Sequence, residues 1–258
     1  RDFKTKEFRE DIVADSYQKL DQGLLNFMNH YNFDQFVLAI KGAGFCSSRL
    51  LNSAMTMDFA YTLYLLLLND PAIPNDQIKR YVQKWFVLST LTSRYIGSPE
   101  SQMDRDMHSM EEKGFLAFLE EVEASALSDT FWSVTLPQNL ETSAVNSPVF
   151  NVFLAAQIRL NANSLLMHGT KVSDLIAISG DIHHIFPRAY LKKNGVDSKT
   201  KYNQVANYIY LNTQVNKAIS DSAPCDYFKR AIQQCESKVP SFGNITDTTA
   251  LKKNLEEN

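Results

Sequence analysis

The segment NYIYLNTQVNKAIS, residues 207–220, joins the pattern of a short strand to that of a short helix. Its first residues alternate tyrosine with isoleucine and leucine, which predicts a half-buried strand, and a helix is expected over about residues 213–220. Upstream lies DIHHIFPRAYL, residues 181–191, which places two adjacent histidines between apolar residues. We expect the local order strand, long loop, strand, helix, with the histidine pair on the first arm.

The two histidines are expected to have different roles. Neighbouring residues on an extended segment point to opposite faces, so His183 and His184 would not perform the same task. One could bind a metal ion while the other holds a water molecule, and Asn216, roughly one turn after Asn212, could bring a second ligand oxygen. A purely structural role for the histidine pair is the alternative.

Composition indicates a globular protein. The chain has 258 residues, of which 44% are hydrophobic and 21% are charged, and this balance excludes global disorder. The apolar run LYLLLL at residues 63–68 is much shorter than the roughly 20 residues that a membrane span needs. The three cysteines form no CxxC pair, which favours reduced thiols in a cytoplasmic protein. The chain begins RDFKTKEFRED, without a methionine or a secretory signal, so we expect a fragment of a longer protein.

Residues 1–172 predict a helical domain. Apolar stripes mark helices within residues 7–30 and 47–69, and Asp76 is a candidate cap for the next helix. Two serine-proline pairs, at residues 98–99 and 147–148, have the form of helix starts, and Gly114 is a candidate stop. Residues 127–146 are expected to form a looser connection.

Residues 173–258 predict a smaller domain of strands and helices. LIAIS at residues 175–179 is compatible with a strand, and a helix is expected from Pro224 to Cys235. The predicted fold is therefore mainly α, a helical bundle followed by a small C-terminal α+β domain. The net charge is −6 for residues 1–170 and +3 for residues 171–258, so the second part is the more basic.

The loop after the histidine pair is basic. Its five cationic residues, opposed only by Asp197, are Arg188, Lys192, Lys193, Lys199 and Lys201. A partner that carries phosphate groups would favour such a patch, although an ordinary solvated loop has the same appearance.

Taken together, DIHHIFP and NYIYLNTQVNKAIS resemble the ββα-metal fold of HNH endonucleases, also called His-Me finger nucleases. The resemblance implies that His184 is the general base and that His183 binds a divalent cation. It further implies that Asn207 braces the loop and that Asn216 is the distal metal ligand. Asp181 is a candidate additional metal ligand.

The resemblance implies Mg²⁺ or Mn²⁺ as the cofactor. A nitrogen ligand at His183, where aspartate is commoner, favours manganese or another transition metal. Lys217 and the basic loop are then the expected contacts to the phosphates of DNA. Two simpler interpretations stay open, in which Asn207 and Asn212 serve as turn or cap residues and Asn216 is solvated.

The wider chain is similar to the C-terminal half of GmrSD-type, modification-dependent restriction enzymes. HHIFPRAYL, ANYIYLN, NKAIS and the segment KWFVLSTLTSRYIGSPESQMDRD at residues 84–106 carry this similarity. It implies a DNA endonuclease of bacterial antiviral defence that acts on foreign, modified phage DNA. It also implies a separate N-terminal domain that handles nucleotide and is absent here. The alternative is a non-catalytic module with a degenerate HNH fold that binds nucleic acid or another protein.

Three further sets of residues are expected to be structural. A salt-bridge network is predicted for Arg94, Tyr95, Asp104 and Asp106. Structural or surface positions are predicted for His30, His108 and His168. Core positions are predicted for the aromatic residues Trp85, Phe86, Phe131 and Trp132.

Overall fold

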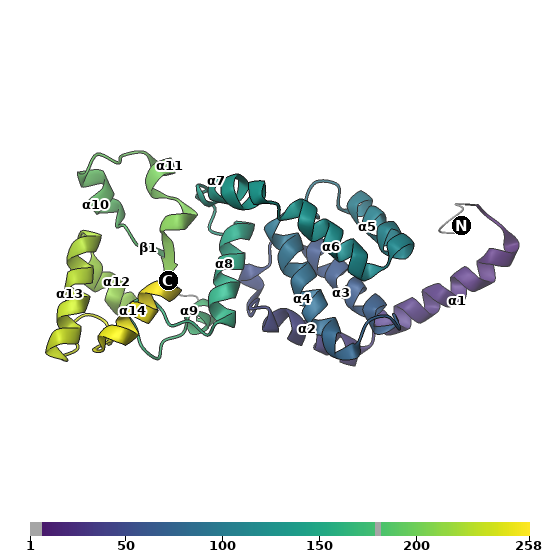
Figure 1. Cartoon of the computed structure of the whole chain (residues 1–258), viewed down its shortest axis with the longest axis horizontal. Coiled ribbons are helices and arrows are strands. Elements are labelled where there is room, and N and C mark those ends of the chain that lie inside the picture. The colour runs from purple at the N-terminus through teal and green to yellow at the C-terminus, as the bar shows by residue number, and fades with distance from the viewer. Residues whose placement is uncertain (1–6, 179–181) are drawn as a thin grey trace.

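The computed structural model of the protein describes residues 7–178 and 182–258. Over these residues, fourteen α-helices and one two-stranded sheet make the fold mainly helical. The molecule is elongated, with α1 at one end and α13 near the other (Figure 1). The helices of its first part are α1 (Glu10–Phe27), α2 (His30–Gly42), α3 (Ala54–Leu68), α4 (Asn75–Leu91), α5 (Pro99–Lys113), α6 (Phe115–Ala126), α7 (Leu136–Leu140) and α8 (Pro148–Arg159). The elements that follow are α9 (Val172–Ala177), β1 (Ile182–His184), α10 (Arg188–Lys193), α11 (Lys199–Tyr202), β2 (Tyr208–Tyr210), α12 (Thr213–Ile219), α13 (Pro224–Ser237) and α14 (Thr248–Glu257).

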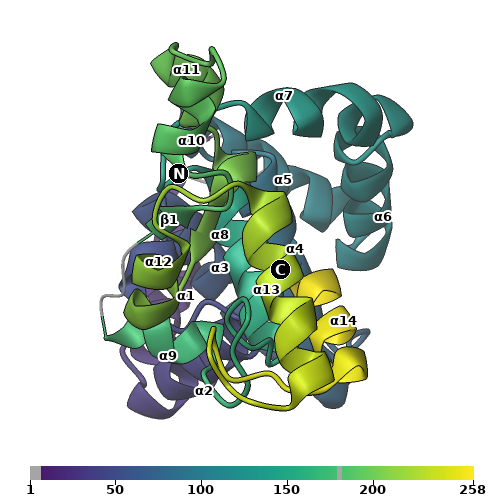
Figure 2. The ribbon, with the colours of Figure 1, turned by 90° about the vertical axis from the view of Figure 1, so that its left-hand side faces the viewer.

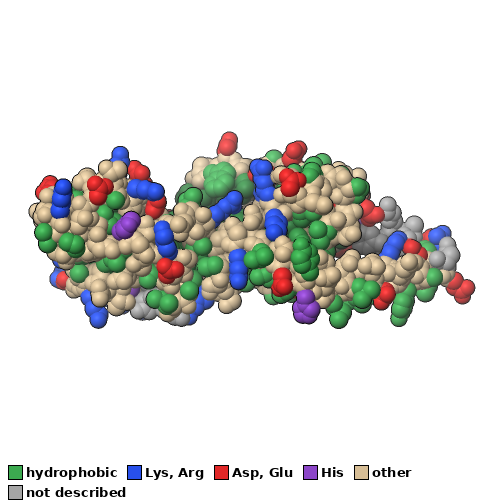
Figure 3. Space-filling model, turned by 90° about the horizontal axis from the view of Figure 1, so that it is seen from below, with side chains coloured by type: hydrophobic (Ala, Val, Ile, Leu, Met, Phe, Trp, Pro, Cys, Tyr) green, Lys and Arg blue, Asp and Glu red, His purple; other side chains and the backbone are tan. Residues whose placement is uncertain are grey.

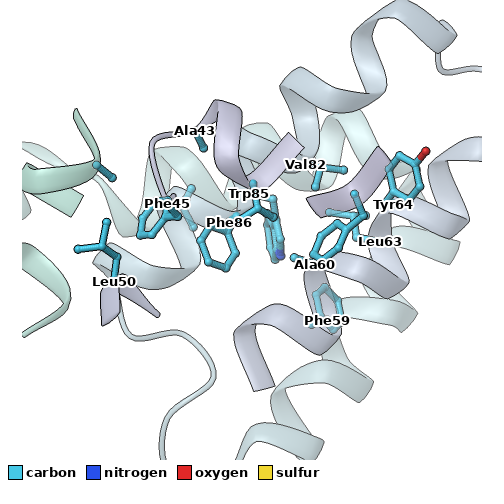
Figure 4. Packing of buried hydrophobic residues seen from close by; sticks show 14 of the residues in the cluster. Ala43, Phe45, Leu50, Phe59, Ala60, Leu63, Tyr64, Val82, Trp85 and Phe86 are labelled. Carbon is cyan, nitrogen blue, oxygen red and sulfur yellow. The ribbon is translucent and has the colours of Figure 1, made fainter. Parts of the chain in front are cut away.

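A first hydrophobic core holds α2, α3, α4, α6 and α8 together. Trp85 of α4 is fully buried and packs against Phe59 and Phe118 from α3 and α6. Figure 4 shows Trp85 near Phe59, and Phe45 and Phe86 extend the aromatic cluster beside Trp85. Close packing of large rings contributes both buried apolar area and favourable ring geometry, so this cluster fixes the helices around it.

Several helix limits follow from local chemistry. The Ser147 hydroxyl accepts a hydrogen bond from the Phe150 amide, so the predicted start of α8 is capped as expected. Gly114 ends α5 with a φ of 82°, a conformation that glycine adopts without strain. Asp76 is not the cap of α4, which begins at Asn75, and it lies in the first turn instead. The connection at residues 127–146 contains a π-helical turn, Phe131–Thr135, and α7.

Helix α1 projects from the bundle and exposes apolar side chains (Figure 1). Hydrophobic side chains reach the surface along this end of the molecule in Figure 3. The exposed apolar residues of α1 include Val13, Tyr17, Leu20 and Leu24. The predicted helix over residues 7–30 therefore exists, but it ends at Phe27 and lies outside the core for most of its length.

The sheet pairs β1 with β2 in antiparallel register, and α12 follows β2. His184 lies opposite Tyr208, and His183 lies opposite Ile209. Tyr208 and Tyr210 belong to the first core, whereas Ile209 and Leu211 belong to a second core with α12, α13 and α14. The strand was expected to be half-buried. Because the two cores cover both of its faces, β2 is instead buried throughout.

Two expectations about the second part of the chain are wrong. Leu175, Ile176 and Ala177 of the predicted strand LIAIS instead belong to helix α9, and Leu175 and Ile176 enter the first core; residue 179 lies outside the described residues. The predicted long loop between the strands contains α10 and α11. Both project from one side of the sheet, as Figures 1 and 2 show.

The structure also describes the state of the cysteines and the character of the helices. All three cysteines are free thiols, and Cys235 is the buried one. Among the residues that the structure describes, none of the helices combines the length and apolar character required to cross a membrane.

Candidate functional site

The histidine pair lines a small pocket between β1, α10 and α12. The pocket has a volume of about 150 Å³, and His183, His184 and Asn216 all line it. Arg188, at the start of α10, completes a polar wall. The sheet register sets the histidines on β1, while one turn of helix after Asn212 brings Asn216 to the same space. Three residues that the sequence singled out are therefore brought together.

His184 is held by a contact that the sequence did not reveal. Its Nε2 lies 2.9 Å from the side-chain oxygen of Asn203, and its ring packs edge-on against Tyr208 at 5.3 Å between ring centres. An amide oxygen only accepts, so Nε2 carries the proton in this contact and the lone pair of a neutral ring resides on Nδ1. The arrangement fixes both the tautomer and the orientation of His184.

Asn207 ties the strand ends to the loop after the histidines. Its side-chain oxygen accepts from the Phe186 amide at 2.7 Å, and its side-chain nitrogen donates to the carbonyls of Phe186 and Tyr202, both at 3.1 Å. The backbone adds a fourth bond, from the Ile185 amide to the Asn207 carbonyl at 2.9 Å. One side chain thus fixes the chain directly after His184.

The opposite side of this loop is anchored from α13. The Tyr227 hydroxyl donates to the carbonyl of Ile185 at 2.7 Å, and the Tyr227 side chain is fully buried. Burial raises the pKa of Tyr227, so its hydroxyl keeps its proton and remains a donor. Asn207 and Tyr227 together hold the backbone at Ile185 and Phe186 from two elements.

The donor set of the pocket fits a divalent cation that takes mixed nitrogen and oxygen ligands. His183 offers an imidazole nitrogen and Asn216 an amide oxygen. No cluster of three or more His, Cys, Asp or Glu side chains suited to a metal ion occurs within residues 7–178 and 182–258. Water and a phosphate group of the substrate would complete the coordination shell, as is common for Mg²⁺. Asp181 lies outside the described residues.

Backbone strain marks the edge of the same pocket. Ser220, which ends α12 and lines the pocket, has a φ of 50° and a ψ of −117°. A left-handed conformation of this kind is unfavourable for a residue with a Cβ, and such strain concentrates at functional sites. Ser220 was not predicted, since nothing in its local sequence requires a positive φ.

The predicted phosphate contacts divide into three groups. Arg188 and Lys192 lie over the buried ring of Tyr202, at 5.3 Å and 5.7 Å from its centre. Lys193 forms an ion pair with Asp221, and its ammonium group lowers the pKa of the Asp221 carboxyl. The remaining cations are exposed on α11 and α12: Lys199, Lys201 and Lys217.

The residues expected to be structural form a buried network away from this pocket. The Asp106 carboxylate accepts from Arg94 at 2.8 Å and 2.6 Å, from the Tyr95 hydroxyl at 2.8 Å and from Gln102 at 2.8 Å. Asp106 is only 2% exposed. The predicted salt-bridge network therefore exists with Asp106 at its centre, whereas Asp104 contacts His108.

One predicted core aromatic is not in the core. Trp85, Phe86 and Phe131 are buried, but Trp132 is 50% exposed and lines a separate, larger pocket. Its indole nitrogen donates to the Leu127 carbonyl at 3.0 Å, which holds the ring at the surface. The prediction was wrong for Trp132, which follows the buried Phe131 in the π-helical turn and lines the pocket instead of the core.

Comparisons with known proteins find little similarity. No protein-family model matches the chain, and no solved structure matches it. A protein of Methanocaldococcus jannaschii, described as uncharacterized, is 26% identical over 160 residues, which cover 61% of this chain. The chain spans about a quarter of that protein's length, since the match covers 26% of it. At this identity and coverage, the match assigns neither a family nor an activity.

Proposed function

We propose that this protein is a divalent-metal-dependent endonuclease that hydrolyses phosphodiester bonds of DNA. The observation that carries the proposal is the pocket that brings His183, His184 and Asn216 together beside Arg188. The order of β1, β2 and α12 around this pocket, two strands followed by a helix, supports the proposal, because the resemblance in sequence implies the same order.

His184 is the proposed general base. Because the Nε2–H group of His184 donates a hydrogen bond to the side-chain oxygen of Asn203, the Nδ1 lone pair is the site that would take a proton from an attacking water molecule. Asn207 and Tyr227 hold the backbone beside His184, and their role is to keep the base in position during the reaction.

His183 and Asn216 are the proposed ligands of the cation. When bound, Mg²⁺ or Mn²⁺ would supply positive charge beside a phosphate oxygen and the leaving 3′ oxygen. Arg188 lines the same pocket, and its guanidinium, which lies over the Tyr202 ring, is the proposed partner of two non-bridging phosphate oxygens through paired donors.

The exposed lysines extend this positive surface along the DNA backbone. Lys199, Lys201 and Lys217 are exposed, and they are the proposed sequence-independent contacts. Lys193 contributes less free charge because Asp221 neutralises it. The motif similarity to GmrSD-type enzymes makes modified phage DNA the first specific substrate to test, with a nucleotide-handling domain as the proposed regulator.

Cleavage of supercoiled plasmid and of modified phage DNA with Mn²⁺ or Mg²⁺ tests the proposal. We expect metal-dependent nicking by the wild-type protein and its loss in His184→Ala. His30→Ala removes an exposed histidine at the start of α2 and should leave nicking unchanged. DNA binding without any cleavage would instead favour the non-catalytic module.

A further inference from the structure

A second, much larger pocket lies where the helical bundle meets the chain before β2. Its volume is about 760 Å³, within the range of roughly 300–1,000 Å³ that small-molecule sites occupy. Helices α4, α6, α7 and α8 form most of its wall, and residues 205–208 close one side. It is separate from the histidine pocket, although Tyr208 contributes to its lining.

The wall is apolar and contains aromatic side chains that remain partly in water. Trp132 is 50% exposed and Phe153 is 39% exposed, and both line the pocket together with Leu136 and Val152. Leaving such rings in water forgoes about 25 cal/mol for each Å² of apolar surface, so a ligand with an apolar body would gain by covering them.

The charged groups of this pocket favour an anion. Arg80, Lys84 and Arg159 line it against a single acidic side chain, Glu123. Lys84 and Glu123 form an ion pair with each other. Within the described part of the chain, neither Arg80 nor Arg159 makes an ion pair, and both are exposed at the rim. A guanidinium at the mouth of an apolar cavity suits a carboxylate, which it can bind through paired donors.

We propose that this pocket binds an amphipathic carboxylate, with its apolar body against Trp132 and Phe153 and its carboxylate at Arg80 or Arg159. The binding does not depend on nuclease activity. One consequence rests on the proposed function. Tyr208 lines the larger pocket and its ring contacts His184, so a ligand bound there would shift the ring of the proposed base.

Decanoate is the probe, and decanol is the matched neutral control of equal chain length. The chain has two tryptophans, and Trp85 is fully buried in the first core, so a change in tryptophan fluorescence on titration reports Trp132. We expect saturable binding of one decanoate, confirmed by calorimetry, with decanol binding more weakly. The fluorescence change should vanish in Trp132→Phe while the calorimetric signal persists.

The arginines and Phe153 supply the decisive variants. Replacing Arg80 and Arg159 by Gln should weaken decanoate binding by about fivefold, the upper range for exposed ion pairs, and leave decanol binding unchanged. Phe153→Asp should weaken both probes. Circular dichroism checks the fold of each variant. Absence of saturable decanoate binding would overturn the proposal, as would equal affinity in the wild type and both sets of variants.

Discussion

The brace at Asn207 gives the sharpest test of the loop geometry. Asn207→Ala removes three side-chain hydrogen bonds, those to the Phe186 amide, the Phe186 carbonyl and the Tyr202 carbonyl. At about 1 kcal/mol for each bond, the loop loses about 3 kcal/mol of local stability. The Phe186 amide should therefore exchange with deuterium roughly 100-fold faster, since each 1.4 kcal/mol changes an equilibrium by about tenfold.

The same change should lower the cleavage rate. Release of the loop shifts His184, and a displacement of about 1 Å costs on the order of a hundredfold in rate. Asn194→Ala is the matched control, because Asn194 bonds only locally, to the Tyr190 carbonyl at the end of α10. Hydrogen exchange followed by mass spectrometry, together with plasmid nicking, measures both effects. Wild-type exchange at Phe186 in Asn207→Ala would refute the bracing role, whatever the activity.

Three other predictions concern the metal, the DNA and the fold. Millimolar Mn²⁺ should raise the melting temperature, by the equivalent of about 2.7 kcal/mol at 100 times the dissociation constant, and His183→Ala with Asn216→Ala should abolish the shift. Replacing Lys199 and Lys201 by Ala should weaken DNA binding for all sequences and reduce the salt slope by about one for each lysine; an unchanged slope would remove them from the interface. Asp106→Asn should cost about 3 kcal/mol in urea unfolding, because it leaves the half-buried Arg94 guanidinium without its charge partner.

The local chemistry of the chain predicted much of the helical architecture. Trp85 was predicted to lie in the core, and in α4 it is fully buried. Ser147 began α8 through a cap that involves only neighbouring residues. Signals of this kind act over a few residues, so they can be recognised without knowledge of the tertiary structure.

The wrong predictions about secondary structure and burial arise from tertiary packing, which the local sequence does not show. LIAIS is a short apolar run, and such a run suits a strand or a buried helix equally well. The residues form helix α9 because a helix lets Leu175 and Ile176 pack into the first core. The burial of both faces of β2 has the same cause, because only the folded chain shows that a second core lies beneath Ile209 and Leu211.

The sequence grouped His183, His184 and Asn216, which the structure brings to one pocket, but it did not reveal the side chains that hold them in place. Adjacent histidines on a strand and an asparagine one helical turn after a cap are patterns that a sequence displays. Asn203 and Tyr227 contact the site through the folding of α11 and α13, from positions with no motif of their own. The asparagine at residue 203, four residues before Asn207 in YNQVAN, was the available hint.

The proposal of a metal-dependent nuclease depends most directly on His184. Nicking of supercoiled plasmid should be measured for the wild type, His184→Ala and His30→Ala at equal concentration, with Mn²⁺ and with a chelator. The proposed mechanism predicts nicking by the wild type and His30→Ala, loss of nicking with the chelator, and a rate lower by about 10²–10⁴-fold in His184→Ala, the usual contribution of a general base. Wild-type nicking by His184→Ala, or the absence of metal-dependent nicking by the wild type, would contradict it.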